Sequence, residues 1–291
     1  MSFTAPTTVD EAIRALAGAP GLAKPLAGGT DLLVQLRSGR TRPEVIVDIK
    51  RIPQLIGIRE TDDSYLIGAA TPGVMLSEHE SLPHAWPGIV EGVDLIGSQQ
   101  IQGRASLVGN LCNASPAADS VPSMIAARAV AVIAGPDGRR EAPVEAIVTG
   151  PGQTSLKKGE FIVEFRVPKP RPRQCDAYLR FIPRTEMDIA VVGCGVNVAV
   201  DAAGVCTDAR VVLGAVAATQ VVVEEGAQAL IGHRLDDDTL SRLDTAAQRA
   251  CKPINDKRGT IEYRTKVAGV LARRAAKIAF ERAQGRVAGA H

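Results

Sequence analysis

The chain has 291 residues, a formal net charge of +2, 45% hydrophobic residues and 23% charged residues. This composition is ordinary for a soluble globular protein, and the charge gives no electrostatic reason to expect nucleic acid or an anionic membrane as a partner. No apolar run reaches the ~18 residues that a membrane span needs. The N-terminus also lacks a basic stretch followed by an apolar one, so we expect a cytoplasmic protein.

The cysteines and histidines show no metal-binding or disulfide pattern. The five cysteines are an odd number and include no C-x-x-C pair: Cys112, Cys175, Cys194, Cys206 and Cys251. Their spacing disfavours a disulfide framework and any zinc or iron–sulfur site built by this chain alone. Of the four histidines, only His79 and His84 are near each other, so we expect no metal site.

The N-terminal part predicts alternating helices and strands. Thr8 and Glu11 form a capping-box pattern before apolar residues at helical spacing, which predicts a helix over residues 9–17. We then expect a short strand over 24–27, a glycine turn, a helix capped by Thr30 or Asp31, and a buried strand over 45–49.

The next stretch predicts a second mixed unit. We expect a hairpin with strands at 56–60 and 65–70, helices starting at Thr71 and spanning 87–96 and 121–128, and strands at 129–134 and 160–167. A loop rich in Gly and Pro covers 150–159. Residues 104–120 lie between two helical patterns and predict a long ordered loop, in which Ser115 can cap a helix that starts at Pro116.

The C-terminal part begins after an expected linker. Residues 168–173 alternate proline with basic residues, a pattern typical of an extended linker that joins two units without packing into either. Beyond it we expect an antiparallel meander of strands at 174–181, 189–200 and 205–214, and then helices at 226–231, 238–251 and 260–284.

The first candidate binding stretch is Ala27-Gly28-Gly29-Thr30-Asp31. A strand, a glycine pair and a helix start place backbone N–H groups and a hydroxyl around one point, and this geometry suits a pyrophosphate. The stretch is neither G-x-G-x-x-G nor a Walker A loop. An ordinary glycine turn is the alternative interpretation.

Two further stretches, residues 104–120 and 184–190, are rich in polar side chains. In residues 104–120, Gly109 allows the backbone to approach a ligand closely, and short side chains supply donors and acceptors: Ser106, Asn110, Asn113 and Ser115. The alternative is a connector that satisfies only its own backbone. The stretch from Arg184 to Ala190 stands at the entry to a strand, and its plain interpretation is a surface salt bridge worth at most about 1 kcal/mol.

Together these stretches resemble the flavin subunit of the molybdenum hydroxylases, the group of xanthine dehydrogenase and carbon monoxide dehydrogenase. The matching stretches are 24–32 (Lys-Pro-Leu-Ala-Gly-Gly-Thr-Asp-Leu), 106–110 (Ser-Leu-Val-Gly-Asn), 113–119 (Asn-Ala-Ser-Pro-Ala-Ala-Asp), 184–190 (Arg-Thr-Glu-Met-Asp-Ile-Ala) and 258–264 (Arg-Gly-Thr-Ile-Glu-Tyr-Arg). They occur in the family's order and span essentially the whole chain.

The resemblance implies an α+β fold. It consists of a two-subdomain FAD-binding domain of the vanillyl-alcohol-oxidase/PCMH-like type and a C-terminal domain with a three-stranded antiparallel sheet and helices. We expect the two α/β subdomains at 1–52 and 53–168, with FAD in the cleft between them, and the C-terminal domain at 174–291.

The resemblance also implies a set of FAD-binding residues. The pyrophosphate would be surrounded by Ala27, Gly28, Gly29, Thr30 and Asp31, with Leu32 beside them. A second loop against the cofactor would consist of Ser106, Leu107, Val108, Gly109 and Asn110. Asp119 would hold a polar group of the ribityl or ribose region, Ile162 would pack near the adenine or the ring, and Arg180 falls roughly where the family often has a lysine near the flavin.

One departure concerns the second loop. The family usually has Thr and Gly where this chain has Ser106 and Val108. The branched side chain of Val108 excludes a positive φ, which bears on how closely this backbone can approach FAD.

The implied function is electron transfer. A large molybdopterin subunit would hydroxylate the substrate, a small subunit with [2Fe–2S] clusters would relay electrons, and the FAD of this chain would pass them to an external acceptor, in a dimer of heterotrimers. Since a flavin carries the redox chemistry, no residue here is expected to act as acid, base or nucleophile. Three alternatives stay open: a stand-alone flavin oxidoreductase, a nucleotide-binding module without redox chemistry, and an interaction subunit whose cofactor loops have decayed.

Overall fold

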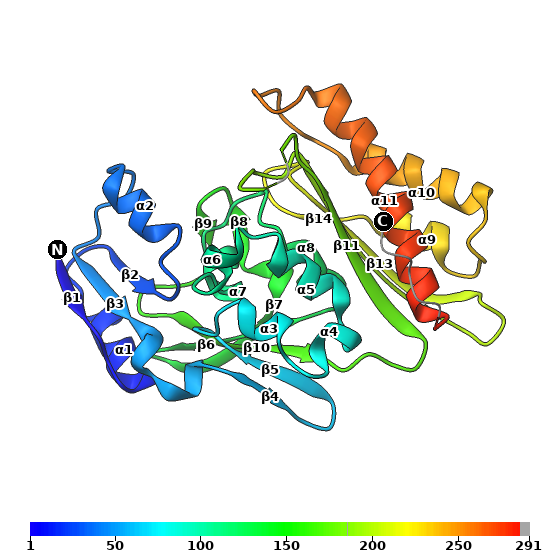
Figure 1. Ribbon diagram of the computed structural model, residues 1–291. Coiled ribbons are helices and arrows are strands. Elements are labelled where there is room, and N and C mark those ends of the chain that lie inside the picture. The colour runs from blue at the N-terminus through cyan, green and yellow to red at the C-terminus, as the bar shows by residue number, and fades with distance from the viewer. Residues whose placement is uncertain (185, 286–291) are drawn as a thin grey trace.

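The first unit is the N-terminal part of the chain. It contains a small parallel sheet in the strand order β1–β3–β2, drawn in blue in Figure 1. The computed structural model describes residues 1–184 and 186–285. The elements of this unit are β1 (Ser2–Thr4), α1 (Val9–Ala17), β2 (Ala23–Leu26), α2 (Leu32–Arg37), β3 (Val45–Asp48) and two 3-10 turns, Ile49–Arg51 and Pro53–Leu55. The predicted helix–strand order is confirmed, whereas the three-residue edge strand β1 is too short to show a periodicity.

The two helices of this unit begin differently. The capping box of α1 is confirmed, because the Thr8 side chain accepts from the Glu11 N–H and the Glu11 carboxylate accepts from the Thr8 N–H. The predicted cap of α2 is wrong, since Asp31 occupies the N-cap position without a side-chain hydrogen bond. Helix α2 buries none of its residues and stands away from the rest of its unit in Figure 1.

The second unit is a five-stranded antiparallel sheet in the order β4–β5–β10–β6–β7. Its elements are β4 (Ile58–Glu60), β5 (Ser64–Gly68), α3 (Val74–Ser77), α4 (Leu82–Ala85), α5 (Pro87–Asp94), α6 (Gln99–Gln102), α7 (Leu107–Cys112), α8 (Ser120–Ala126), β6 (Val130–Gly135), β7 (Gly138–Pro143), a 3-10 turn (Val144–Ala146), β8 (Val148–Gly150), β9 (Gln153–Thr154) and β10 (Phe161–Pro168). Strand β10 is the last strand of this unit in the chain but lies in the middle of its sheet, where Phe161 and Phe165 are buried.

The prediction of a long loop at 104–120 is wrong in its centre. Residues 107–112 form α7, whose N-cap Ser106 accepts from the Gly109 N–H at 3.1 Å. Leu107 and Leu111 anchor this short helix in the core. No helix starts at Pro116; the Ser115 hydroxyl instead accepts from the Ala117 N–H at 3.2 Å and closes a local turn.

The C-terminal unit is an antiparallel sheet in the order β11–β12–β13–β14, with α11, α9 and α10 beside it. Its elements are β11 (Gln174–Phe181), β12 (Val192–Val200), β13 (Cys206–Gly214), β14 (Val221–Val222), α9 (Glu224–Leu230), α10 (Asp237–Ala250) and α11 (Ile261–Ala283). The predicted meander and helices are confirmed, but the sheet has four strands rather than three, since a two-residue strand shows no pattern.

Strand β12 is buried along its whole length because both faces of the sheet are covered. On one face Cys194, Val196 and Val198 pack in the core that includes the alanines of α11. On the other face Asn197 donates to the Ala126 carbonyl of α8 at 3.0 Å, and a side chain at Gly195 would lie 2.8 Å from the backbone of α8. The C-terminal unit is therefore packed directly on the second unit.

A buried carboxylate marks this contact. Asp176 of β11 accepts from the Gly88 N–H of α5 at 2.8 Å through Oδ1, whereas its Oδ2 has no hydrogen-bond partner among the described residues. Burial raises the pKa of Asp176 to about 7; the nearby Glu91 adds to this increase, and the Gly88 N–H and Arg282 oppose it. Asp176 therefore titrates near neutral pH at the contact between two units.

The predicted linker packs against both of its neighbours, contrary to expectation. Trp86 donates to the Pro168 carbonyl at 2.7 Å, and the Lys169 ammonium lies 5.7 Å from the centre of the Tyr65 ring. On the other side, Arg171 pairs with Asp208 of β13. The segment is not extended throughout either, because the Gln174 N–H donates to the Arg171 carbonyl at 3.1 Å and Arg173 has a φ of +59°, which makes its end a turn.

Candidate cofactor site

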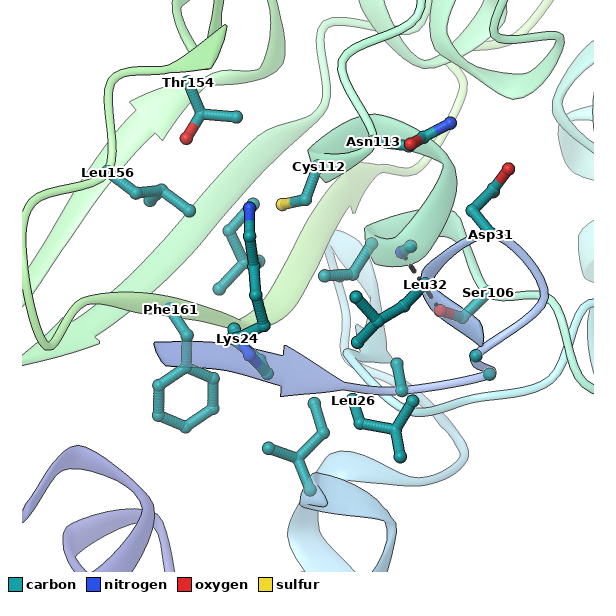
Figure 2. A pocket seen from close by; sticks show the side chains of 18 of the residues that line it. Lys24, Leu26, Asp31, Leu32, Ser106, Cys112, Asn113, Thr154, Leu156 and Phe161 are labelled. Atoms are coloured by element: carbon teal, nitrogen blue, oxygen red, sulfur yellow. Dashed lines mark hydrogen bonds between the residues drawn. The ribbon is translucent and has the colours of Figure 1, made fainter. Parts of the chain in front are cut away.

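A cavity of about 460 Å³ lies between the first and second units. Its walls come from the β2 strand with the turn after it (residues 21–32), from the residues around α7, and from the segment 152–162. Figure 2 shows Lys24 extending from β2 between Cys112 of α7 and Leu156 of the segment before β10. The volume falls within the range of roughly 300–1,000 Å³ of small-molecule and cofactor pockets.

The turn at Gly28 and Gly29 packs directly on the backbone of the segment before α7. A Cβ at Gly28 would lie 1.9 Å from the carbonyl oxygen of Arg104, and Gly29 has a φ of +82°, a conformation that L side chains rarely adopt. The backbone N–H groups of residues 28–32 donate no hydrogen bond within the described part of the chain. Five adjacent donors thus stay available to an acceptor such as a pyrophosphate.

The second wall is α7 and its cap. A Cβ at Gly109 would meet only the Ser106 hydroxyl, at 3.2 Å, so the backbone on this side is open to the cavity. Val108 lies within the helix and has no positive φ. The concern that valine excludes a required left-handed backbone is therefore removed, and the Val108 side chain serves as a buried part of the wall.

The structure brings most of the predicted residues to this one cavity. Its walls include Ala27, Gly28, Gly29, Thr30, Asp31, Leu32, Ser106, Val108, Gly109, Asn110 and Ile162. Three predicted residues do not contribute to its walls. Leu107 is buried in the core, and Asp119 and Arg180 pair with each other outside the cavity.

The Asp119–Arg180 pair is buried next to the site. Asp119 accepts from Arg180 at 2.8 Å and from the Tyr178 hydroxyl at 3.0 Å. Burial raises the pKa of Asp119 to about 6, and Arg180 and Tyr178 oppose that increase. The next residue, Ser120, donates to Oδ1 of Asn110 at 2.8 Å, so a short chain of contacts joins this pair to the cavity wall.

Several residues on the cavity walls had not been singled out from the sequence. Gln35 of α2 donates to the Asn113 side chain at 2.7 Å, which joins α2 to the end of α7 across the cavity. Lys24 and Lys157 add cations to the walls. Burial raises the pKa of the Cys112 thiol to about 12, so this group stays protonated at neutral pH. Lys24 stands in the stretch 24–32, which the sequence analysis had singled out, whereas the Gln35–Asn113 contact spans residues far apart and has no local pattern.

The predicted surface salt bridge in the third stretch is confirmed. Arg184 pairs with Asp188 at 3.2 Å, and Arg184 together with the backbone N–H of Ile189 holds the pKa of the Asp188 carboxyl below its usual range. Within residues 1–184 and 186–285, no three His, Cys, Asp or Glu side chains gather closely enough to hold a metal ion. No helix in these ranges is both long and apolar enough to cross a bilayer.

The fold and the cavity define a cofactor-binding protein in which two α/β units form the site and a third unit packs against them. The family model of the FAD-binding domain in molybdopterin dehydrogenase matches residues 1–170, and that of the CO dehydrogenase flavoprotein C-terminal domain matches residues 177–279. The chain therefore belongs to the FAD-binding flavoprotein family of the molybdenum hydroxylases.

Relatives and solved structures agree with this assignment. The chain is 33% identical to the carbon monoxide dehydrogenase medium chain of Hydrogenophaga pseudoflava, over 96% of this chain and 97% of the relative. It is 30% identical to the xanthine dehydrogenase FAD-binding subunit of Escherichia coli O157:H7, over 98% of both chains. Its structure matches that of carbon monoxide dehydrogenase from Hydrogenophaga pseudoflava with a TM-score of 0.93, over 97% of this chain and 98% of the other.

Proposed function

We propose that this chain carries FAD in the cavity between its first two units and passes electrons from the [2Fe–2S] clusters of a partner subunit to an external acceptor. The observation that carries this proposal is the convergence of two stretches, 27–32 and 106–110, on one cavity. Its other support is the naming of the relatives as medium chains or FAD-binding subunits of dehydrogenases.

The residues of the cavity suit a dinucleotide. The free N–H groups of residues 28–32 would donate to the pyrophosphate, and Lys24 would add positive charge. Asn110 and Ser106 would line the second side of the cofactor, with Gly109 leaving room for it. Leu32 and Ile162 would supply apolar contact, as expected for a pocket that must also hold rings.

The buried pair beside the cavity would act on the cofactor indirectly. Asp119 and Arg180 are predicted to stand near the sugar or the ring of FAD, and both side chains are occupied with each other. Their combined charge is close to zero, so we expect them to position Asn110 and the segment before β12 rather than to set the charge beside the ring.

The chemistry belongs to the cofactor, because a bound flavin accepts and returns electrons. The protein's contribution is to bind, to orient and to exclude water. The apolar walls along β2 and β10 restrict water access, and the Cys112 thiol stays protonated and therefore unreactive.

We also propose the wider organisation. Subdomains at 1–52 and 53–168 would hold FAD between them, with 174–291 as the C-terminal domain. The chain would join a large molybdopterin subunit and a small iron–sulfur subunit, a proposal supported by relatives named as a medium chain and as a subunit of a dehydrogenase complex. We further propose that this assembly is a dimer of heterotrimers. All five cysteines are free, which fits the reducing cytoplasm.

The test compares two versions of the purified complex, one with the wild-type chain and one with Gly28 and Gly29 both changed to valine. We expect both to oxidise substrate with an artificial dye that accepts electrons before the flavin. Only the wild-type complex should contain FAD and reduce the physiological acceptor. A valine variant that retains stoichiometric FAD, or reduces the acceptor without it, would contradict the proposal.

A further inference from the structure

A single hydrogen bond joins the part of the chain around α2 to the rest of the described protein. Residues 29–40, which we call the α2 segment, contain this helix and the turn on each side of it. Their backbone bonds stay inside the segment, as from the Leu33 N–H to the Gly29 carbonyl and from the Arg40 N–H to the Gln35 carbonyl. The exception is the bond from the Gln35 side chain to Asn113 of α7, at 2.7 Å.

Only one face of α2 contacts the protein. Leu32 and Gln35 are three positions apart, and therefore on the same side of the helix, and both line the cofactor cavity. Leu33 and Val34 are 48% and 61% exposed, and no residue of the helix is buried. Figure 1 shows α2 held away from the β1–β3–β2 sheet, with a connection on each side. An element with so little buried apolar surface can open without disturbing the core.

Two glycines with left-handed backbone lie on either side of α2. Gly29 has a φ of +82° and Gly39 a φ of +70°. At Gly39 a Cβ would meet only the end of the Arg42 side chain, at 3.9 Å, so the backbone there has room to turn. Beyond these glycines the chain is fixed, because Gly28 packs on the backbone of Arg104 and strand β3 belongs to the sheet. The α2 segment can therefore move between two fixed ends.

The other partner of the bond belongs to a fixed part of the wall. Asn113 ends α7, which Leu107 and Leu111 anchor in the core. Figure 2 shows Asn113 on the side of the pocket where Asp31 stands at the start of α2. Because α7 is anchored and α2 is not, breaking the bond releases α2.

We infer that the α2 segment is a lid on the cofactor cavity, with Gly29 and Gly39 as hinges and the Gln35–Asn113 bond as its latch. This inference rests on the proposed function, because the free N–H groups of residues 29–32 that would bind the pyrophosphate belong to the same segment. A bound dinucleotide would hold these groups and keep the lid closed. The open lid admits and releases the cofactor.

The latch acts on the rates of exchange more than on affinity. It stabilises the closed lid with and without the cofactor, so it slows entry and exit by a similar factor. A side chain that only contacts the cofactor in a static pocket would change the rate of exit alone. The two rates together therefore distinguish a latch from a simple binding contact.

The first experiment is hydrogen exchange of the whole chain after removal of FAD. A six-residue helix is not stable by itself, so its N–H groups exchange once α2 leaves the cavity wall. We expect Gln35→Ala to speed exchange in residues 33–40 by about 2- to 12-fold, the range for loss of one hydrogen bond, with α1 unchanged. Arg37→Ala is the matched control, because Arg37 is on the same helix but is exposed and does not line the cavity.

Two further measurements test the latch and the lid. Asn113→Ala removes the other half of the bond and should give the same increase in exchange, with no further increase in the double variant. FAD at a hundredfold excess over its dissociation constant should slow exchange of the wild-type segment by up to about 100-fold. In stopped-flow experiments, Gln35→Ala should raise the rates of FAD uptake and release by the same factor.

The inference fails if exchange in residues 33–40 stays at the wild-type rate in both Gln35→Ala and Asn113→Ala, or if Arg37→Ala speeds it equally. Faster release of FAD without faster uptake would also overturn it. A wild-type chain that takes up no FAD contradicts the proposed function, whatever the exchange rates are. A chain that binds FAD but whose α2 segment is insensitive to the latch variants contradicts only the lid.

Discussion

A single methyl group at position 28 tests how the cavity is built. In Gly28→Ala the new Cβ would lie 1.9 Å from the oxygen and 2.6 Å from the carbon of the Arg104 carbonyl. Both atoms belong to the backbone, so no side chain can rotate away, and the turn must separate from the segment before α7. Overpacking of this kind typically costs about 1–3 kcal/mol. If that cost falls on the cofactor-bound form, FAD affinity drops about 5- to 150-fold.

The assay is a titration of the chain with FAD after the cofactor has been removed, followed by flavin fluorescence. Gly103→Ala is the control, because Gly103 has a φ of −63° and a Cβ there would have its nearest contact with the Gln100 oxygen at 3.7 Å. This variant should bind FAD like the wild type. The reasoning is refuted if Gly28→Ala binds FAD with wild-type affinity, or if Gly103→Ala loses it to the same degree.

Three other changes give separate expectations. Gln35→Ala removes the hydrogen bond to Asn113 and should raise the FAD dissociation rate several-fold, since such a bond contributes about 0.5–1.5 kcal/mol; stopped-flow release at the wild-type rate would contradict this. The pKa of Asp176 is raised from 3.8 to about 7 in the folded state, so the folded protein binds this proton more tightly than the unfolded chain does. The free energy of unfolding should therefore fall by up to about 4 kcal/mol as pH rises from about 4 to about 7. Asp176→Asn should lose most of that decline in urea titrations at pH 5 and pH 8, and an unchanged pH profile would show that another group causes it. Asp119→Asn leaves Arg180 buried without its counter-charge and should lower the free energy of unfolding by about 3–5 kcal/mol, with partial recovery in the double variant Asp119→Asn/Arg180→Met; no recovery would contradict the pairing argument.

The sequence predicts well where local chemistry decides the structure. The Thr8–Glu11 capping box and the turn at Gly28 and Gly29 depend on adjacent residues, and both are present in the structure. The three long strands of the C-terminal sheet show clear apolar patterns, and they are confirmed. The family resemblance added what periodicity alone does not give, namely that two distant stretches lie on one cavity.

The errors have physical causes that a sequence scan does not reveal. Helix α7 is six residues long and begins at a serine cap inside a polar stretch, so its periodicity is too short to recognise. The 168–173 segment was expected to be free of contacts, but the partners that bind it, such as Trp86 and Asp208, lie far away in the chain. The same holds for Gln35 and Asn113, whose contact depends on tertiary packing.

The most direct test of the central claim is the absorption spectrum of the purified wild-type chain, separated from its iron–sulfur and molybdopterin partners, together with identification of the cofactor that heat releases. We predict the bands of an oxidised flavin and the release of FAD, rather than FMN, in an amount equal to the chain. A colourless chain that also fails to take up added FAD would contradict the assignment of the cavity as the FAD site.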